Sequence, residues 1–413
     1  MSEVRQITNA VKYIVPCVDV VFNRNCKKKE IEFDIKYLAR YVKKVINDPL
    51  TKTHVYELEL NGLMDNETVR CYSESNPKTD YSFRLKNIQV FTFPTKTSFI
   101  VFEIEHDYET LEEIIKFNYP NVHALTRDYY YVYKRNNEDH KITLMGVLLH
   151  LFHKVGQYPE DGRLYAMHKI YNTKTEANWL SHEVLYQLEA LSNGYDYVND
   201  DVRMGDQLSL MQCETFSHSY YIQWACSAYG VVNYAMKSHK TFYEDRFHQN
   251  VLSYYFAVYL LALHERITLL NYSAKVVSSW KDYKYISKVR DELLQFDVQF
   301  AYNTISEHNN YQIFYEHLYK IMRLEYLESE VEDSCTKIVD QYKDRQENIL
   351  EILLGVISVL AFSSFIKDTV DWLEEYWGIS FGGRNIFIIL TMVTLVLFIV
   401  FMMVRIRRSR RIR

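Results

Sequence analysis

The sequence predicts an α+β protein: a cytosolic α/β domain, then long helices, a continuous stalk helix and a C-terminal two-helix transmembrane hairpin. Three observations lead to this prediction. Short runs of β-branched and aromatic residues fill the first 135 positions. Few helix breakers follow, since the 413 residues include 6 prolines and 11 glycines. Two long apolar stretches lie close to the C-terminus.

The predicted α/β domain covers residues 1–140. Alternating runs bounded by turn signals predict strands at 11–22, 53–60, 68–72, 82–93, 98–105 and 129–133. Apolar residues at helical spacing predict amphipathic helices at 30–47 and 108–118.

Residues 141–310 are predicted to form a helical domain, because strand signals become rare there. The expected helices cover 141–155, 175–192, 205–237, 241–272 and 282–307. The stretch 251–263 is almost wholly apolar but too short to span a membrane, so it predicts a buried core helix.

The predicted stalk helix covers residues 311–348. Its apolar positions step by three and four, as in an imperfect heptad pattern, and neither a cap nor a proline precedes Ile349. One helix of more than fifty residues is therefore expected to run into the first apolar stretch.

The predicted hairpin consists of transmembrane helices at 349–366 and 386–404, joined by an external loop at 367–385. Each stretch has about the length that a helix needs to cross a hydrocarbon core of roughly 30 Å. The basic tail 405–413 contains six arginines, which should keep it in the cytoplasm together with the N-terminus. These features predict a multi-pass protein of the inner (plasma) membrane.

Charge and cysteine content limit the class of protein. The chain has 48 basic and 53 acidic residues, and six of the basic residues belong to the tail, so the rest is acidic. Such a balance argues against direct nucleic-acid binding. Six scattered cysteines without a Cys-x-x-Cys pair indicate free thiols in a reducing compartment.

One face of the first predicted span carries the residues expected to line a pore. They follow one another at helical spacing: Asn348, Glu351, Gly355, Ser358, Phe362 and Phe365. In a symmetric ring, Glu351 would attract cations and the phenylalanines would form an apolar constriction. In the alternative, Glu351 reaches the interface and the small residues only pack helices.

Two aromatic segments could hold a nucleotide, which needs a stacking surface and positive charge. The first supplies Arg127, Tyr129, Tyr131, Lys134 and Arg135, and the second supplies Tyr220 and Trp224. Alternating tyrosines on a strand also fit ordinary core packing, so both interpretations stay open.

Enzymatic motifs are weak, and we predict no catalytic residue, no bound metal and no cofactor. Arg163 and His168 have the Arg-x4-His spacing of HEPN ribonucleases, a pattern short enough to occur by chance. His150 and His153 could share a metal, but no carboxylate or cysteine nearby completes the set.

The order of these segments resembles the CorA magnesium-channel family. In residues the likeness is strongest from Leu293 onward, in an aromatic and acidic pattern: Phe300, Tyr302, Tyr311, Phe314, Tyr315, Leu318 and Leu324-Glu-Tyr-Leu-Glu328. That family carries Gly-Met-Asn at the outer end of its first span. This chain has Phe365-Ile-Lys-Asp368 there, and Phe381-Gly-Gly-Arg-Asn385 follows. In lacking the filter, it resembles the CorA-like membrane effectors of type III CRISPR defence.

The resemblance implies a membrane effector of antiviral defence, gated by a nucleotide second messenger, that opens an ion path or disrupts the membrane. The implied ligand is the conjugate of S-adenosylmethionine and AMP. The implied partners are the lipid bilayer and further copies of the chain in a homo-oligomer, a pentamer by family resemblance. Two alternatives remain: a divergent divalent-cation transporter with an altered filter, and a membrane-anchored enzyme or scaffold.

Overall fold

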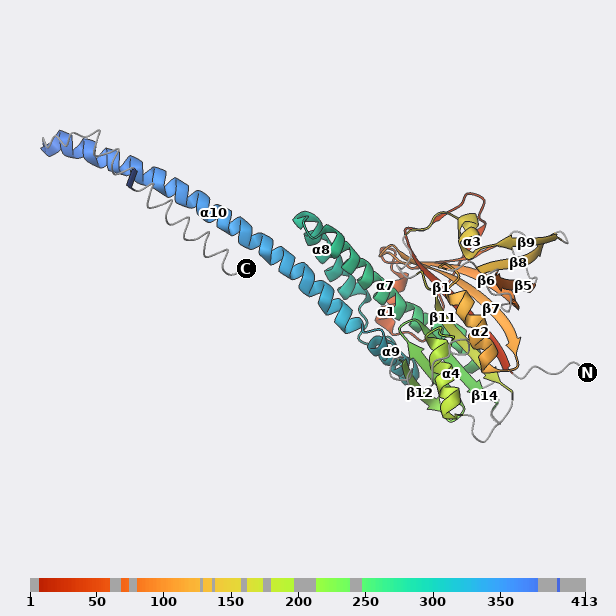
Figure 1. Ribbon diagram of the computed structural model, residues 1–413. Coiled ribbons are helices and arrows are strands. Elements are labelled where there is room, and N and C mark those ends of the chain that lie inside the picture. Colours follow the sequence, from red (N-terminus) through yellow and green to blue (C-terminus); the bar gives the residue numbers. More distant parts are fainter. Residues whose placement is uncertain are drawn as a thin grey trace, which may run out of the picture. The chain divides into compact units, whose positions relative to one another are not determined.

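The computed structural model describes residues 7–59, 68–73, 80–126, 129–135, 138–156, 162–173, 180–196, 213–237, 247–377 and 392–393 (Figure 1). Contacts divide the chain into two compact units. The first contains residues 1–278 and 289–332, and the second contains residues 279–288 and 333–413.

A mixed sheet of 12 described strands forms the centre of the first unit. The strands are β1 (Ile7–Val18), β3 (Lys28–Ile31), β4 (His54–Leu58), β5 (Thr68–Ser73), β6 (Asp80–Thr92), β7 (Thr97–Tyr108), β8 (Tyr129–Arg135), β9 (Glu138–Ile142), β11 (Tyr165–Asn172), β12 (Cys213–Ser219), β13 (Ile222–Ser227) and β14 (Gly230–Met236). Their main order is β12-β13-β14-β11-β1-β7-β6-β5-β8-β9, with β4 paired to β3 and β6. β2 (Val21–Phe22) and β10 (Phe152–Lys154) form a separate pair.

The helices follow the predicted apolar periodicity in most places. They are α1 (Arg40–Asn47), α2 (Leu111–Val122), α3 (Leu144–Leu151), α4 (His182–Ser192), α6 (His248–Asn250), the π-helix η2 (Val251–Tyr255), α7 (Phe256–Ser279), α8 (Tyr283–Phe300), α9 (Asn309–Ile321) and α10 (Leu324–Trp377). Side-chain oxygens cap the N-termini of α2, α3 and α4: Thr110 accepts from the amide of Glu113, Thr143 from that of Gly146, and Ser181 from that of Val184. These hydroxyls satisfy amides that have no partner within the helix.

The two faces of the sheet differ in composition because alternate residues of a strand point to opposite faces. On β1, Tyr13 belongs to the hydrophobic core that α2 and α4 cover. The neighbouring Lys12 faces the other way, where its ammonium lies 4.3 Å from the ring centroid of Phe256 at the start of α7. α7 therefore covers the second face, and Thr268 also bonds Thr97 there, at 3.0 Å.

A buried polar network lies on the α2 side of the sheet. Asn118 Oδ1 accepts hydrogen bonds from Tyr13 and from His168 Nε2, each 3.0 Å long. The second ring nitrogen of His168 lies 3.4 Å from Asn9 Oδ1, and the Asn118 amide donates to the Leu191 carbonyl. These hydrogen bonds join strands β1 and β11 to helices α2 and α4. Each of these polar groups would cost free energy if it were buried without a partner.

The structure has strands where the sequence predicted a helix at 205–237. β13 and β14 are buried at every position, and β14 pairs in parallel with β11. A strand covered on both faces shows no polar and apolar alternation, so its sequence resembles that of a buried helix. Because β11–β14 extend the same sheet as β1 and β7, the first unit continues well beyond residue 140.

α10 is the predicted long helix, and it covers 54 residues. It begins later than the predicted stalk, because the chain leaves α9 at Met322 and turns through Arg323, whose φ is 56°. In the second unit, Tyr283 stacks on Tyr342 with ring centroids 4.7 Å apart, and Cys335 and Val339 are buried.

The predicted transmembrane hairpin is wrong. Within the part of the chain that the structure describes, no helix is both long and apolar enough to cross a bilayer. Residues 349–366 are an internal part of α10, which continues through Lys367, Asp368 and Asp371 where an external loop was predicted. Most of 386–404 and the tail 405–413 lie outside the described residues. The prediction of a multi-pass inner-membrane protein is overturned with the hairpin.

We expect the buried histidine to make stability fall in mild acid. Burial lowers the pKa of His168 to about 3, whereas an unfolded histidine has a pKa near 6.5. Below pH ~6.5 the unfolded chain gains a proton that the folded chain does not, which lowers the free energy of unfolding by about 1.4 kcal/mol per pH unit.

Urea unfolding between pH ~7 and ~5 measures this effect. His168→Gln should be less stable than wild type at pH ~7 but should lose about 2 kcal/mol less on acidification. Replacing the exposed His182 by Gln is the matched control and should keep the wild-type slope. Equal slopes for His168→Gln and wild type would show that His168 titrates alike in both states.

Candidate ligand site on the charged sheet face

Five residues of the sheet face beneath α7 form what we call the charged sheet face: Lys12, Glu103, Glu105, Lys169 and Asn233. They lie on four neighbouring strands, β1, β7, β11 and β14. The strand register pairs Asn233 with Lys169 and Lys12 with Glu103, so these side chains leave the same face side by side. Ala10 of β1 pairs with Lys169 on one side and with Glu105 on the other, so it lies between them in the sheet.

Two ion pairs neutralise the carboxylates of this face. The Lys12 ammonium lies 3.5 Å from Glu103, and the Lys86 ammonium lies 2.8 Å from Glu105. Burial lowers the pKa of Lys12, and the Glu103 carboxylate counteracts that shift. The Lys12 side chain is 8% exposed and the Glu105 side chain 38%, so the face is closed near β1 and open to solvent along β7.

Lys169 is the cation of this face that has no ion-pair partner among the described residues. Burial lowers its pKa, while Glu103 and Glu105 raise it from a distance. A mostly buried ammonium without a counter-ion is costly, because desolvation is not offset by a close opposite charge. Perturbed ionisable groups of this kind gather at functional sites.

Asn233 is fully buried, and neither its amide nitrogen nor its carbonyl oxygen has a hydrogen-bond partner. Buried polar atoms are nearly always paired, since an unpaired one costs about 1–3 kcal/mol. Its neighbours in register are Lys169 on β11 and Trp224 on β13. An unpaired amide beside an unpaired ammonium is the strongest local evidence for a bound ligand.

α7, the helix that covers this face, is preceded by an irregular helical turn. η2 is a π-helical turn at Val251–Tyr255 that packs against β11, and Phe256 follows it over Lys12. Short π-helical turns are rare and often occur at functional sites. Here the turn contributes the ring of Tyr255, which lies 4.9 Å from that of Trp224.

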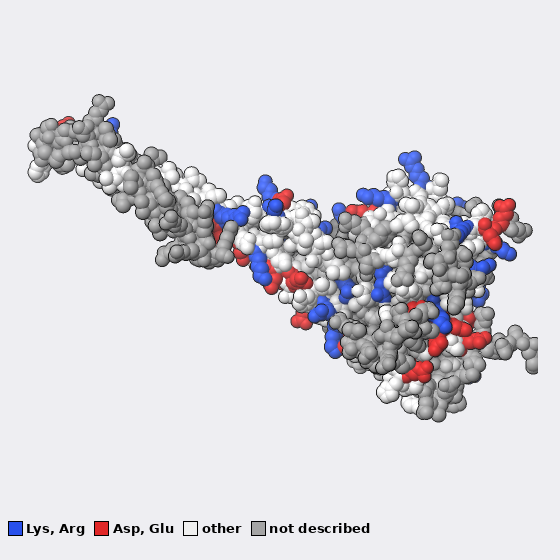
Figure 2. Space-filling view, in the orientation of Figure 1, with Lys and Arg blue, Asp and Glu red and all other residues white. Residues whose placement is uncertain are grey.

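The chemistry of this face suits a ligand with an anionic group and a flat polar edge. The Lys169 ammonium can pair with a phosphate or a carboxylate. The Asn233 amide carries a donor and an acceptor, as does the edge of an adenine ring. Figure 2 shows basic and acidic side chains interspersed on the visible described surface.

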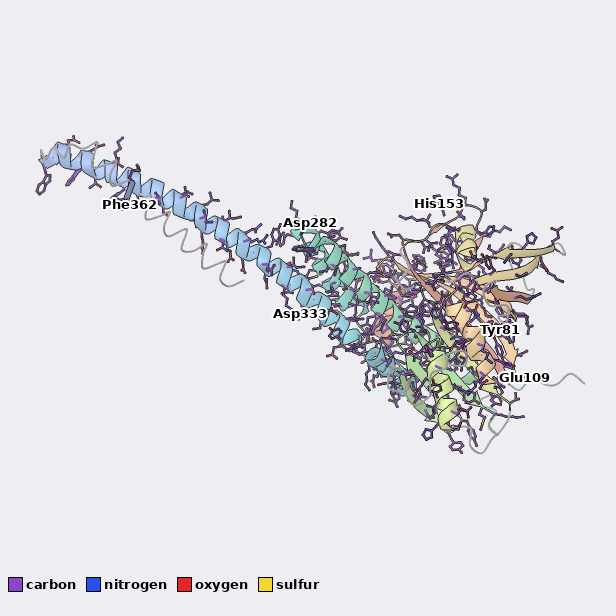
Figure 3. The ribbon with its side chains drawn as sticks, viewed as in Figure 1. Tyr81, Glu109, His153, Asp282, Asp333 and Phe362 are labelled. Atoms are coloured by element: carbon purple, nitrogen blue, oxygen red, sulfur yellow. The ribbon has the colours of Figure 1, made fainter. Side chains whose placement is uncertain are left out.

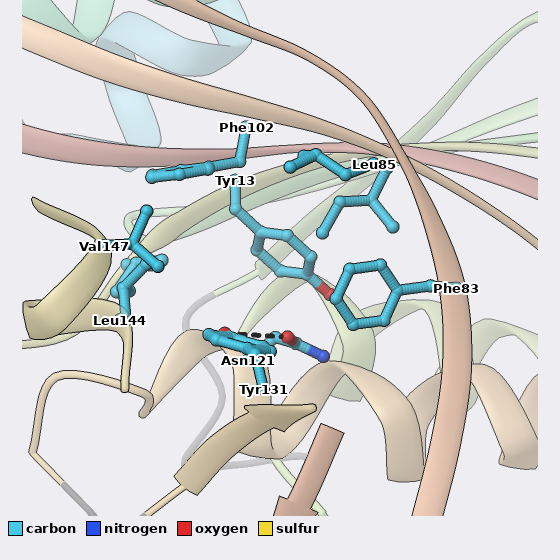
Figure 4. Close-up of a pocket in the computed structure, with 10 residues that line it drawn as sticks. Tyr13, Phe83, Leu85, Phe102, Asn121, Tyr131, Leu144 and Val147 are labelled. Carbon is cyan, nitrogen blue, oxygen red and sulfur yellow. Dashed lines mark hydrogen bonds between the residues drawn. The ribbon is translucent and has the colours of Figure 1, made fainter. Parts of the chain in front are cut away.

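The structure places the tyrosines of the first predicted ligand segment in the core. Tyr129, Tyr131 and Tyr133 are each at most 7% exposed. Tyr131 donates to Asn121 at 3.2 Å and lines an internal cavity of about 20 Å³ next to Tyr13 (Figure 4). That volume holds one water molecule and is far too small for a nucleotide.

Lys134, the basic residue of that segment whose side chain the structure describes, does not lie among these tyrosines. Lys134 is exposed on β8, and Arg135 ends the strand in register with Glu138. Arg127 lies outside the described residues. The structure therefore separates the tyrosine rings from Lys134 by the thickness of a strand.

The second predicted segment is also divided. Tyr220 is 70% exposed in the turn between β12 and β13, whereas Trp224 is fully buried. The Trp224 ring packs against Phe314 of α9 at 4.8 Å and against Tyr255. Trp224 thus lies on the same face of the sheet as Asn233, beside it in register.

All six predicted pore residues lie on α10 within the second unit: Asn348, Glu351, Gly355, Ser358, Phe362 and Phe365. Phe362 and Phe365 are 50% and 65% exposed (Figure 3). Ser358 donates to the carbonyl of Leu354 within the helix. With the transmembrane helices overturned, a membrane pore is not proposed further.

The histidines singled out from the sequence have different environments. His150 and His153 border a surface hollow of about 740 Å³ together with Arg24 and Cys26, and His153 points away from the sheet (Figure 3). Within the described ranges, no group of three His, Cys, Asp or Glu side chains could hold a metal. His168 is fully buried in its network, away from Arg163, which packs 4.3 Å above the Tyr229 ring.

No known family model matches the chain, and no curated protein matches it. The resemblance to CorA channels and to CRISPR effectors therefore stays a prediction.

Sequence reasoning missed the charged sheet face, although one signal was present. Lys12 interrupts the apolar run 10–18, and Lys169 interrupts 164–170. A lysine inside a strand that is otherwise apolar at neighbouring positions is rarely buried without a partner or a function. The pairing of β11 with β14, which brings Asn233 beside Lys169, has no signal in either segment alone.

We expect the replacement of Asn233 by Leu to stabilise the fold. It removes two unpaired buried polar atoms at nearly constant volume, so the free energy of unfolding should rise by about 1–3 kcal/mol. Urea denaturation of the full chain measures the change. Asn118→Leu is the matched control, and it should destabilise by about 1–3 kcal/mol because Tyr13 and His168 lose their acceptor. Destabilisation by both variants would mean that Asn233 has a structural partner.

Proposed function

We propose that this chain is a nucleotide-responsive effector whose first unit binds a phosphate-bearing adenine nucleotide on the charged sheet face, without cleaving it. The observation that carries the proposal is the register pair of Lys169 and Asn233: among the described residues the partly buried ammonium has no ion-pair partner and the buried amide has no hydrogen-bond partner. The resemblance described above supplies the candidate ligand, the conjugate of S-adenosylmethionine and AMP.

Two polar groups of the charged sheet face match the phosphate and the adenine ring of such a ligand. The Lys169 ammonium would hold the phosphate, and the Asn233 amide would pair with the adenine edge. Binding would supply the missing hydrogen bonds of Asn233 and a counter-charge for Lys169.

Binding on this face would also contact the irregular start of α7. η2 and Phe256 lie against β11 and Lys12, so a ligand at Lys169 would touch the segment that leads into α7. A π-helical turn can shift to α-helical geometry by moving one residue, which makes it a suitable element for a response.

The test is calorimetric titration of the full-length protein with the S-adenosylmethionine and AMP conjugate, and with AMP and S-adenosylmethionine separately. We expect saturable binding of the conjugate and at least about a tenfold rise in Kd for Lys169→Gln, because a charge-assisted hydrogen bond contributes about 1.5–3 kcal/mol. Unchanged ligand after incubation would agree with binding without cleavage.

The control variant is the pair Arg127→Ala with Lys134→Ala, which removes the charges of the other predicted segment. It should bind as wild type does. If this pair weakens binding and Lys169→Gln does not, the ligand lies at 127–135 and our site is wrong. If wild type binds none of the three compounds, the assignment of an adenine nucleotide fails.

A further inference from the structure

A surface hollow of the first unit has a volume that suits a small molecule. It measures about 740 Å³, and binding sites for small organic ligands typically have volumes of about 300–1,000 Å³. Its walls come from β2 and the loop at 23–26, from the end of α3 with β10, and from Glu59 after β4. We call it the β2–α3 hollow. It shares no residue with the charged sheet face.

Hydrogen bonds of Asn23 fasten two walls of the β2–α3 hollow to each other. The Asn23 side-chain amide donates to the carbonyls of Leu149 and His150, at 3.1 and 2.8 Å. Its backbone amide donates to the Leu151 carbonyl at 3.0 Å. These carbonyls belong to the last turn of α3, where they have no partner within the helix. The loop and the helix end are therefore joined before any ligand binds.

The charged groups of the lining favour an anion. Arg24 is exposed and forms no ion pair within the part of the chain that the structure describes. Glu59 is the carboxylate of the described lining, and the Lys27 ammonium, 3.6 Å away, balances its charge. His150 and His153 also line the hollow and add ring N–H donors. The β2–α3 hollow thus offers one unbalanced positive charge and several donors.

The lining also has an apolar part. Phe22 belongs to it, and its ring packs on those of Phe152 and Tyr56, with centroids 5.4 Å apart in each pair. Val21 and Leu149 line the hollow as well, and they are 47% and 61% exposed. Covering this apolar surface would favour a ligand that has an apolar body.

A further cation is held next to the Phe22 ring. The Lys28 ammonium lies 4.0 Å from the ring centroid of Phe22 and 4.4 Å from that of Tyr56. The electron-rich faces of the two rings attract the ammonium. Because it stays close to a residue of the lining, its charge adds to the positive potential of the β2–α3 hollow.

We propose that the β2–α3 hollow binds a phosphate monoester that carries an aromatic or aliphatic body. The Arg24 guanidinium pairs with two phosphate oxygens, and His150 and His153 donate to the phosphate group. A phosphate monoester has three terminal oxygens and a charge of about −1.5 to −2 at pH ~7, which these three donor side chains match better than they match the two oxygens of a carboxylate. The body of the ligand covers the apolar part of the lining.

Cys26 provides a reporter within the β2–α3 hollow. It belongs to the lining and is partly exposed, so a bound ligand should keep a thiol reagent away from it. Cys213 on β12 is also partly exposed but lies outside the hollow, which makes it the internal control. The other four cysteines are buried: Cys17, Cys71, Cys226 and Cys335.

Alkylation of the full-length protein by iodoacetamide tests the proposal, with phenyl phosphate as the probe and mass spectrometry of the peptides that contain Cys26 and Cys213. Saturating phenyl phosphate should slow the alkylation of Cys26 by at least about fivefold and leave the rate at Cys213 unchanged. Inorganic phosphate lacks the apolar body and phenylacetate lacks the phosphate. Each should need at least about a tenfold higher concentration for the same protection.

Arginine variants provide the decisive comparison. Arg24→Gln should raise the phenyl phosphate concentration for half-protection by at least about tenfold, because the charge-assisted hydrogen bonds are lost. Arg24→Lys keeps the charge without the planar fork and should give an intermediate value. Arg40→Gln, the same change at an exposed arginine of α1 outside the hollow, should match wild type.

Three results would overturn the proposal. The first is wild-type protein in which phenyl phosphate does not protect Cys26. The second is equal half-protection in wild type and Arg24→Gln, which would place the phosphate away from Arg24. The third is protection by phenylacetate at the same concentration as by phenyl phosphate, which would contradict the assignment of a phosphate monoester.

Discussion

The antiparallel pairing of β1 with β7 is the interaction on which the first unit depends. Twelve residues of each strand are in register, from Ile7 with Tyr108 to Val18 with Thr97. This register decides which side chains face each way, since a shift by one residue would exchange Lys12 with Tyr13. The polar network around Asn118 and the charged sheet face are thus two consequences of one pairing.

The sequence predicted some elements of this arrangement and missed others. The strand at 98–105 and the helix at 108–118 correspond to β7 and α2, because a β-branched and aromatic run bounded by turn signals and an amphipathic helix each have a local signal. β13 and β14 were predicted as helix, since both faces of these strands are buried. Residues 349–366 were predicted to span a membrane because hydropathy alone does not show that the helix continues into charged residues.

The candidate site could not be predicted from the sequence, because tertiary packing and long-range strand pairing decide which side chains meet there. Tyr129, Tyr131 and Trp224 have the right chemistry for a nucleotide, but the fold uses their rings for packing. Tertiary contacts decide which tyrosine rings remain accessible to a ligand, and composition does not show these contacts. The charged sheet face combines residues of four strands, β1, β7, β11 and β14, that are far apart along the sequence, and their order in the sheet is decided only by long-range pairing.

α7 connects the charged sheet face to the helices that follow it. Its first residue, Phe256, covers Lys12, and further along the same helix the Glu265 carboxyl group accepts a hydrogen bond of 2.9 Å from Tyr315 of α9. A ligand that moved η2 would therefore act on a helix that is hydrogen-bonded to the last helix before α10. Coupling between two sites requires an element that both sites bias, and α7 is the element that contacts the candidate site directly.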